Sequence, residues 1–452
     1  MATIRVGVAT VDFTPEPGLP LMGNFRDDYL ARGVHDPLLA KAMVFEDREG
    51  VKAAVLAVDV CMLDRENVAW MRRVVQSGCD VPGENVLIHA THTHSAPAPC
   101  DRYLFGLDFE PYRSDVEASL AKAATAVVRA NERLAPADLS VGYAKEDRIS
   151  FNRRLRRKDG STQMNWEALA LGFDPHEIAG AWGPIDPEIA CLVIEREGRP
   201  GAAVVNFGLH PAILAGDNWL YSADFPGYLA EALSRTLGES FTSLFLNGCC
   251  GNVNHVDYQQ PEQGRGFQMA QRVGYMLGAA AHEAVRARSP VAVDRVAVSS
   301  RRVSLPRIQI GEDERRLCEE VLETAARNPP KGQVDGLPDA FFAELRLAMC
   351  EKQHTPDEVE VTVLHIGDVA LVGLPGENFC ESGMEIKHRS PAPHTLVAGL
   401  SNDAIGYLPT RESFPQGGYE TTVGSTVYTE DAAERLVASA VAQLERLFSS
   451  RQ

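Results

Sequence analysis

Residues 86–99 read Val86-Leu87-Ile88-His89-Ala90-Thr91-His92-Thr93-His94-Ser95-Ala96-Pro97-Ala98-Pro99. The apolar run predicts a buried strand, and the small residues and prolines after it predict the loop by which the strand exits. If strand geometry persists through Thr93, His92 and His94 point to the same side, and both imidazoles can address one metal ion. A pair of hydrogen-bonded histidines at a strand end explains the stretch equally well. The rest of the chain has to decide between the two.

Strands and helices alternate around this stretch. An apolar strand over Val51–Val60 leads into a helix over Asp64–Gln76, and a long amphipathic helix follows over Asp115–Leu134. This alternation is typical of an α/β layer. The same patterns predict a strand at 202–207, helices from Tyr228 and at 268–287, a hairpin at 359–374, a strand at 395–400 and a last helix at 431–447. We therefore expect an α/β fold.

The composition is that of an ordinary globular protein, and its charge is acidic. The 452 residues suffice for one large or two ordinary domains, and 62 Asp and Glu against 44 Lys and Arg leave a formal net charge of −18. This charge repels phosphate backbones and anionic lipid surfaces, so we expect a small-molecule substrate and neither a nucleic acid nor a membrane partner. The basic run 153–158 is the exception, and its plainest interpretation is a solvated loop with a few ion pairs.

The cysteines and the N-terminus bear on the compartment. Nine cysteines are scattered without a Cys-x-x-Cys pair, which favours reduced thiols over a disulfide scaffold. The first residues show no basic segment followed by a long apolar core, so no signal peptide is predicted. We expect a cytoplasmic protein, and the sequence leaves open whether it forms a homo-oligomer. There is no P-loop and no Gly-x-Gly-x-x-Gly after a strand, so phosphate-binding motifs are not supported.

Five predicted strand exits end in groups that can bind a metal or take part in catalysis. Loops at one end of the strands of an α/β sheet converge on one site, although the segments lie far apart in sequence. Each exit alone is weak evidence, since a lone His, Glu or Tyr at a strand end is more often structural. The exits are His92 with His94, His210, the turn from Asn247 to His255, Glu377, and Tyr407.

Together these segments resemble the neutral/alkaline ceramidase family of zinc-dependent amidases, and the resemblance covers almost the whole chain. The motifs that carry it are Thr91–Ser95, Asn206–Pro211, Pro375-Gly376-Glu377, and Ser401-Asn402 followed by Tyr407 and Tyr419. The resemblance implies mixed β-sheets flanked by helices. It also implies a zinc ion held by His92, His210, Glu377 and Tyr407.

Further roles follow from the same resemblance. It implies that His94 touches the substrate or moves a proton, that Asn152 and Arg153 face the substrate, and that Tyr419 is a second active-site tyrosine. The irregular loop Met22–Arg26 is a common kind of place for a site to be lined, and we expect Gly23 to contact the substrate there.

The chemistry of this set is sensible independently of the family. Two imidazoles, a carboxylate and a tyrosine oxygen suit Zn²⁺, with a further position left for water or a carbonyl oxygen. His94 or Asp224 could relay protons, and Arg153 with Tyr419 could stabilise a developing oxyanion. For Asp224 we expect the plainer role of a carboxylate that orients a histidine.

One turn departs from the family. The ceramidases carry a catalytic serine in a Gly-Asp-Val-Ser-Pro-Asn turn, whereas here residues 251–256 put Asn254 in place of the serine and His255 in place of the proline. Asparagine cannot act as a hydroxyl nucleophile, but its amide can donate a hydrogen bond to a carbonyl oxygen or to the attacking water. A mechanism through metal-activated water therefore survives. For the neighbouring Cys249-Cys250 pair, buried packing is a better interpretation than a thiol nucleophile.

We expect a single ceramidase-like catalytic domain over residues 1–452, without the immunoglobulin-like domain that follows it in full ceramidases, and with 311–357 as a helical insertion or lid. The predicted function is zinc-dependent hydrolysis of an amide (C–N) bond in a small or polar substrate, with a mild preference for an acidic one because of the basic run. Two alternatives stay open. One is a hydrolase of an ester, lactone or cyclic amide, and the other is a non-catalytic metal- or ligand-binding protein.

Overall fold

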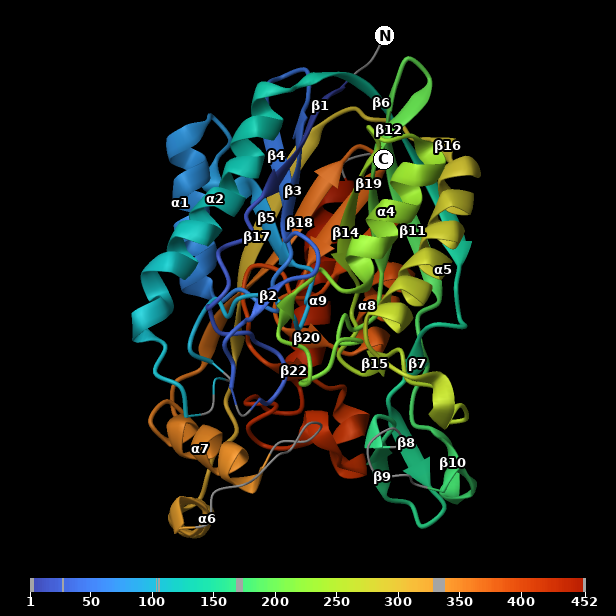
Figure 1. Cartoon of the computed structure of the whole chain (residues 1–452). Coiled ribbons are helices and arrows are strands. Elements are labelled where there is room, and N and C mark those ends of the chain that lie inside the picture. The colour runs from blue at the N-terminus through green and yellow to red at the C-terminus, as the bar shows by residue number, and fades with distance from the viewer. Residues whose placement is uncertain are drawn as a thin grey trace.

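Two β-sheets form the centre of the molecule (Figure 1). The computed structural model describes residues 4–26, 28–102, 104, 106–167, 174–327 and 338–449. The larger sheet runs in the order β14 (Thr242–Asn247), β12 (Arg199–Phe207), β11 (Glu188–Arg196), β6 (Ala135–Lys145), β1 (Ile4–Asp12), β3 (Leu39–Glu46), β4 (Lys52–Val58) and β5 (Val86–Ala90), and β16 (Ser289–Pro290) also pairs with β6. The smaller sheet runs β17 (Val296–Leu305), β18 (Asp357–Ile366), β19 (Val369–Gly373) and β21 (His394–Ala398).

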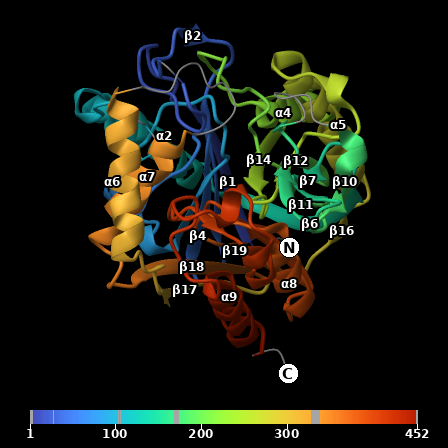
Figure 2. The same cartoon turned by 90° about the horizontal axis from the view of Figure 1, so that it is seen from below.

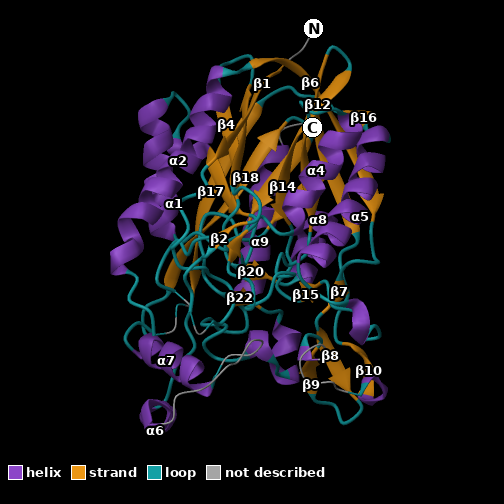
Figure 3. Cartoon of the chain, viewed as in Figure 1, coloured by secondary structure: helices purple, strands orange, loops and turns teal. Residues whose placement is uncertain are grey.

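Helices cover the outer face of each sheet, which gives four layers (Figure 3). The larger sheet is covered by α1 (Arg65–Gly78), α2 (Arg113–Glu132), α4 (Phe225–Leu237) and α5 (Phe267–Arg286). The smaller sheet is covered by α8 (Cys380–Arg389) and α9 (Ala432–Phe448). Seen from below in Figure 2, α2, α4 and α5 lie on one side of the strands and α9 lies on the other. The expected α/β fold with mixed sheets and flanking helices is confirmed.

Strand β12 shows why the central strands are continuously apolar. Ala202 and Val204 face the core between the two sheets, while Ala203 and Val205 face the core under α4 and α5. A strand buried on both faces needs apolar side chains on both faces, so the period-2 alternation of a half-exposed strand disappears. The two sheets therefore share one interior, and helices close it from outside.

The predicted helices agree closely with those observed. Asp64 caps α1 with its side chain, which accepts from the backbone N–H of Asn67, and Val68, Met71 and Val75 are the buried face. The helices predicted at 115–134, 268–287 and 431–447 correspond to α2, α5 and α9 within two residues. Within 311–357 the two expected helices are α6 (Glu312–Arg327) and α7 (Asp339–Cys350). The proline-rich connection at 329–332 lies outside the described residues, and a lid function of this segment stays a prediction.

The carboxyl ends of the parallel strand pairs meet at one end of the sheets. Parallel pairing joins β4 to β5, β12 to β14, and β19 to β21. The buried imidazole of His89 ties the two sheets together there, because its Nε2 accepts from the N–H of Asn247 (2.9 Å) and its Nδ1 donates to the carbonyl of Gly399 (2.8 Å). The loops that leave these strands are therefore held at one place.

No helix among the described residues is long and apolar enough to cross a bilayer.

Short strands line and surround this end. Two pairs belong to the loops themselves, β2 (Gly33–Val34) with β13 (Leu220–Tyr221) and β7 (Phe151–Asn152) with β15 (Val253–Asn254). A small sheet of β10 (Ile178–Ala181), β8 (Arg154–Arg157) and β9 (Thr162–Met164) projects beside them. The last pair, β20 (Glu377–Asn378) with β22 (Tyr407–Leu408), carries two of the expected metal ligands.

Candidate metal centre

Three of the four expected ligands converge on one point. His92 follows β5, His210 follows β12, and Glu377 opens β20. The Nε2 atoms of His92 and His210 are 2.9 Å apart, and they lie 3.3 Å and 3.2 Å from Oε2 of Glu377. All three side chains are buried, and their candidate ligand atoms lie within 4.8 Å of one another. Ligands about 2.0 Å from a tetrahedral zinc ion stand about 3.3 Å apart, so the spacing matches such a site.

Backbone carbonyls fix the orientation of both imidazoles. Nδ1 of His92 lies 2.6 Å from the carbonyl of Cys61, and Nδ1 of His210 lies 3.0 Å from the carbonyl of Cys250. A carbonyl only accepts, so each Nδ1 carries a proton, and Nε2 of each ring is the atom that faces the shared point. This is the arrangement that metal-binding histidines require.

The electrostatics of the three groups favours a cation between them. Burial opposes ionisation of Glu377, yet His92 and His210 outweigh it and hold the pKa of the carboxyl well below its usual value. Burial also opposes protonation of His92, yet Cys61 and Glu377 raise the pKa of His92 to about 10. For His210, burial and the positive charge of Arg153 lower the pKa to about 4. Without a metal ion, the raised pKa leaves the His92 imidazole protonated, and this charge balances the ionised Glu377. A bound metal ion would take the place of that proton.

The backbone at His92 is not that of a strand. Strand β5 ends at Ala90, and His92 has φ 77°, so the expectation of strand geometry through Thr93 is wrong. A non-glycine residue at positive φ costs about 1–3 kcal/mol and persists only where its surroundings enforce it. Here the His92 N–H donates to the carbonyl of Val60, and the Thr93 hydroxyl donates to the carbonyl of Ser222. The positive φ at His92, and not the alternation of side chains along a strand, therefore directs both imidazoles towards one centre.

Tyr407, the expected fourth ligand, lies beside Glu377. Strands β20 and β22 pair in parallel, with Glu377 opposite Tyr407. Residues paired across two strands project to the same side, so the phenol and the carboxylate share one face. Burial, followed by the charge of Glu377, raises the pKa of Tyr407 well above its usual value. A bound cation reverses this effect because it favours the phenolate. Coordination by Tyr407 stays a prediction.

His94 stands next to the ligands without belonging to their triangle. Its Nε2 lies 3.4 Å from Nε2 of His92, and its buried Nδ1 has no hydrogen-bond partner. Burial and the imidazoles of His92 and His210 hold the pKa of His94 well below its usual value, so the ring is neutral. Gly23 packs directly against this ring, since a Cβ at Gly23 would lie 2.7 Å from Nδ1 of His94. Gly23 thus supports His94.

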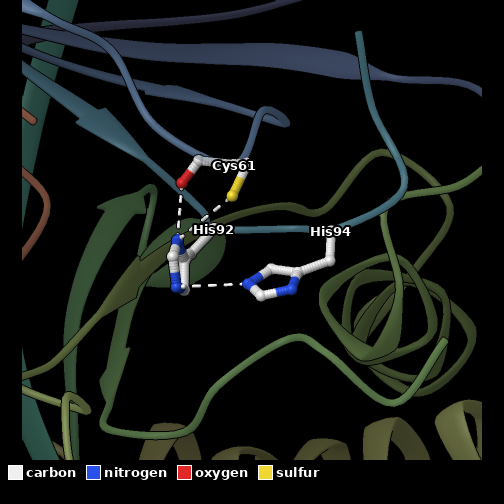
Figure 4. Close-up of side chains that lie close together, drawn as sticks. All are labelled: Cys61, His92 and His94. Carbon is white, nitrogen blue, oxygen red and sulfur yellow. Dashed lines mark hydrogen bonds between the residues drawn. The ribbon is translucent and has the colours of Figure 1, made fainter. Parts of the chain in front are cut away.

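Cys61 forms a second candidate group with His92 and His94 (Figure 4). Its Sγ lies 3.8 Å from Nδ1 of His92, on the side of the ring that faces the Cys61 carbonyl. A metal bound at that nitrogen would displace the proton that the carbonyl accepts. The group of His92, His210 and Glu377 needs no such change, so it is the better metal site. Sequence reasoning did not single out Cys61, which lies just after a predicted strand without a metal-binding spacing.

A cavity of about 190 Å³ adjoins these groups. Seven of the ten residues expected at the site line it, while His92 and Glu377 lie behind them in the ligand triangle and Asn152 does not line it. The seven are Gly23, His94, Arg153, His210, Asn254, Tyr407 and Tyr419. The cavity is therefore the candidate substrate site.

Arg153 enters the cavity from a buried ion network. Its Nε donates to Oε1 of Glu420 (2.7 Å), and Nη1 of Arg154 donates to Oε2 of the same carboxylate (2.9 Å). The guanidinium of Arg153 also lies 5.2 Å from the ring centre of Trp166, and its Nη2 is buried without a hydrogen-bond partner. Because Arg153 and Arg154 are 4% and 1% exposed, the expectation of a solvated loop at the start of the basic run is wrong.

Asn254 is held in a reciprocal amide pair. Its Nδ2 donates to Oδ1 of Asn165 (2.8 Å), and its Oδ1 accepts from Nδ2 of Asn165 (2.7 Å) and from the N–H of Val256 (3.0 Å). Nδ2 has one further N–H, and Asn254 lines the cavity. A catalytic role for Asn254 stays a prediction. Asn165 and Glu420 were missed from the sequence, although each is adjacent to an aromatic residue of the cavity.

Asn152 and Asp224 both make hydrogen bonds to the backbone, and substrate contact by Asn152 stays a prediction. The side-chain amide of Asn152 donates to the carbonyl of Pro184, and its Oδ1 accepts from the N–H of Arg154, so these contacts hold the backbone and give no support to substrate binding. The Asp224 carboxylate accepts from the N–H groups of Ile213, Leu214 and Phe225. It therefore fixes the loop after His210 and does not orient an imidazole, contrary to expectation.

The Cys249-Cys250 pair packs as predicted. Both thiols are buried, and burial raises the pKa of Cys249 to about 12 and that of Cys250 well above its usual value. Such thiols are not nucleophilic at neutral pH.

Comparison with known proteins places this geometry in a family. The model of the family described as "Neutral/alkaline non-lysosomal ceramidase, N-terminal" matches residues 4–255. Neutral ceramidase of Pseudomonas aeruginosa is 24% identical to this chain over 98% of the chain and 72% of that protein. Neutral ceramidase B of Dictyostelium discoideum is 24% identical over 94% of the chain and 70% of that protein. The crystal structure of the Pseudomonas aeruginosa neutral ceramidase superposes with a TM-score of 0.73 at 22% identity, covering 99% of this chain and 75% of that one, which supports the fold.

Proposed function

The chain belongs to the neutral/alkaline non-lysosomal ceramidase family, and from this premise we propose that it is a zinc-dependent hydrolase that cleaves an amide (C–N) bond of a small or polar substrate with metal-activated water. The observation that carries the proposal is the buried triangle of His92, His210 and Glu377. Both imidazoles keep Nε2 free by donating from Nδ1 to a carbonyl, and Glu377 Oε2 accepts no hydrogen bond. With Tyr407 as the fourth ligand, the donor set is one that zinc accepts.

A zinc ion held there would supply a Lewis acid and lower the pKa of a coordinated water to about 7. The protein's own groups divide the remaining tasks. Neutral His94, with a buried and unpartnered Nδ1, can accept a proton from the attacking water and deliver it to the leaving amine. Arg153 lines the cavity and has a buried Nη2 without a hydrogen-bond partner, so its guanidinium can stabilise the charge that develops on the carbonyl oxygen.

Tyr419 and Asn254 complete the proposed machinery. Tyr419 lines the cavity with its ring centre 5.4 Å from that of Tyr407, so its phenol can assist Arg153 at the carbonyl oxygen. The remaining N–H of Asn254 can hold the attacking water or the substrate carbonyl in place. No hydroxyl nucleophile is required, and water attacks directly.

The size of the cavity supports a small substrate. Pockets for drug-sized ligands occupy about 300–1,000 Å³, whereas this one measures about 190 Å³. The nine free cysteines suit a reducing compartment, so we also propose a cytoplasmic location.

The test combines metal content with hydrolysis. Purified protein should contain about one zinc ion per chain by mass spectrometry, a chelator should abolish hydrolysis of a panel of short-chain amides, and added zinc should restore it. His92→Ala should lose both zinc and activity, while His388→Ala, at an exposed histidine of α8, should keep both. Native protein without a bound metal, or full activity in His92→Ala, would refute the proposal. The panel should also include esters, lactones and cyclic amides, because the same groups could act on them. Zinc without turnover of any of these would favour a binding protein.

A further inference from the structure

His255 adds a further polar side chain to the cavity, at the position where the family turn has a proline. The side chain is 7% exposed and lines the same cavity as His94 and Arg153. Its Nε2 is buried without a hydrogen-bond partner, which costs free energy unless a ligand supplies one. Burial lowers the pKa of His255 to about 4, so the ring is neutral at pH 7 and can donate one N–H.

Arg265 lines the same cavity. Residues 256–264 connect it to His255, and hydrogen bonds hold this segment in place. Gln263 donates from Nε2 to the carbonyl of His255 (3.1 Å) and accepts at Oε1 from the N–H of Asp257 (2.8 Å). Beyond Arg265, the N–H of Gly266 donates to the carbonyl of Ile213 (3.3 Å), next to another residue of the cavity wall. The imidazole and the guanidinium therefore come from one segment, 255–266, whose backbone is held by these hydrogen bonds.

The charge of the cavity favours an anion. Among the described residues that line it, none is an aspartate or a glutamate. Arg153 shares the buried carboxylate of Glu420 with Arg154, whereas Arg265 pairs with Asp217 at 3.1 Å, where the two side chains are 36% and 51% exposed. An ion pair that exposed contributes little, so an incoming carboxylate can compete with Asp217 for the guanidinium.

We propose, building on the proposed function, that the enzyme selects amides that carry a carboxylate, and that this carboxylate binds between Nε2 of His255 and the guanidinium of Arg265. Arginine binds carboxylates with short charge-assisted hydrogen bonds, and the neutral imidazole adds one donor. The amide carbonyl of the same molecule then lies toward His94 and Arg153. Arg154 of the basic run is not available to such a carboxylate, because Glu420 occupies its guanidinium.

Binding measurements test this selectivity without relying on turnover. The probes are N-acetylglycine, N-acetyl-β-alanine and N-acetyl-γ-aminobutyrate, each compared with its uncharged carboxamide by isothermal titration calorimetry on the zinc-loaded protein. At least one acid should bind about tenfold more tightly than its carboxamide. Arg265→Met and His255→Leu should each bring that ratio close to one, and Arg265→Lys, which keeps the charge, should retain part of it. Arg272→Met, at an exposed position of α5, should leave the ratio unchanged.

Two results would overturn the inference. One is equal binding of every acid and its carboxamide. The other is a preference that persists in both Arg265→Met and His255→Leu, which would place the carboxylate on the metal ion. Hydrolysis of the same probes is followed separately by amine release. Carboxylate-selective binding without hydrolysis would refute only the proposed function, and hydrolysis without selectivity would refute only this inference.

Discussion

Gly23→Ala should disable His94 without removing the metal. An alanine Cβ at position 23 would lie 2.7 Å from Nδ1 and 2.8 Å from Cβ of His94. Carbon atoms in contact stand about 3.5–4.0 Å apart, so the imidazole has to move by about 1 Å. A misplacement of that size costs about 10²-fold in rate, which corresponds to about 2.7 kcal/mol of transition-state stabilisation. The new methyl group meets only His94 and none of the proposed ligands His92, His210 and Glu377, so the protein should bind as much zinc as the wild type.

Gly18→Ala is the matched control. Gly23 and Gly18 have φ 107° and 117°, so an alanine is similarly strained at both, but a Cβ at Gly18 meets nothing within 4 Å. Both variants should therefore lose similar stability in thermal unfolding, while only Gly23→Ala loses kcat on the best amide of the panel. Equal kcat values for the two variants, with zinc bound in both, would show that the position of the His94 ring does not matter for turnover and would refute its role as proton carrier.

Three further predictions concern the buried polar groups. Glu420→Gln should lower the free energy of unfolding in urea by about 3–5 kcal/mol, because two buried guanidinium groups lose their anion. Glu434→Gln, in an exposed ion pair, should lower it by less than about 1 kcal/mol. Equal losses in the two variants would contradict the buried ion network. Burial raises the pKa of Asp224 from 3.8 to about 6, so its stabilising contribution is complete below pH 4 and is lost as the pH rises through 6. The stability of the wild type relative to Asp224→Asn should fall by about 3 kcal/mol between pH 4 and pH 7, and a pH-independent difference would rule out this titration. Asn254→Ala should lower turnover but leave zinc bound, and loss of the metal would show that Asn254 is a ligand.

Much of the fold could be predicted because its signals are local. The capping aspartate at Asp64 and the 3.6-residue spacing of Val68, Met71 and Val75 define α1 from a few neighbouring residues. The candidate metal ligands could be picked out for a different reason, since each lies at a predicted strand exit in a short motif that resembles the family's. The two-residue spacing alone did not explain how the imidazoles of His92 and His94 come close together. Their approach depends on a positive φ that the carbonyl of Val60 and other distant groups enforce.

The partners of the site residues could not be predicted because they are distant in sequence. Glu420 lies more than 260 residues from Arg153 and Arg154, and the basic run around them has the composition of a solvated loop. Only the fold decides that these two charges are buried and share one carboxylate. The pairing of Asn254 with Asn165, 89 residues away, is hidden for the same reason.

The unpaired atoms at the centre argue against a site that has lost its function with the serine. His94 Nδ1, Arg153 Nη2, His255 Nε2 and Glu377 Oε2 are all buried without a hydrogen-bond partner. Each such atom costs about 1–3 kcal/mol, against a total stability of about 5–15 kcal/mol for a folded protein. Three of these side chains line one cavity, and the fourth belongs to the ligand triangle behind it. Four such atoms lie together here, and a cation and a polar substrate would satisfy them, whereas a disused site would gain stability from apolar replacements. These unpaired atoms therefore support the proposed hydrolysis by metal-activated water over the alternative of a binding protein.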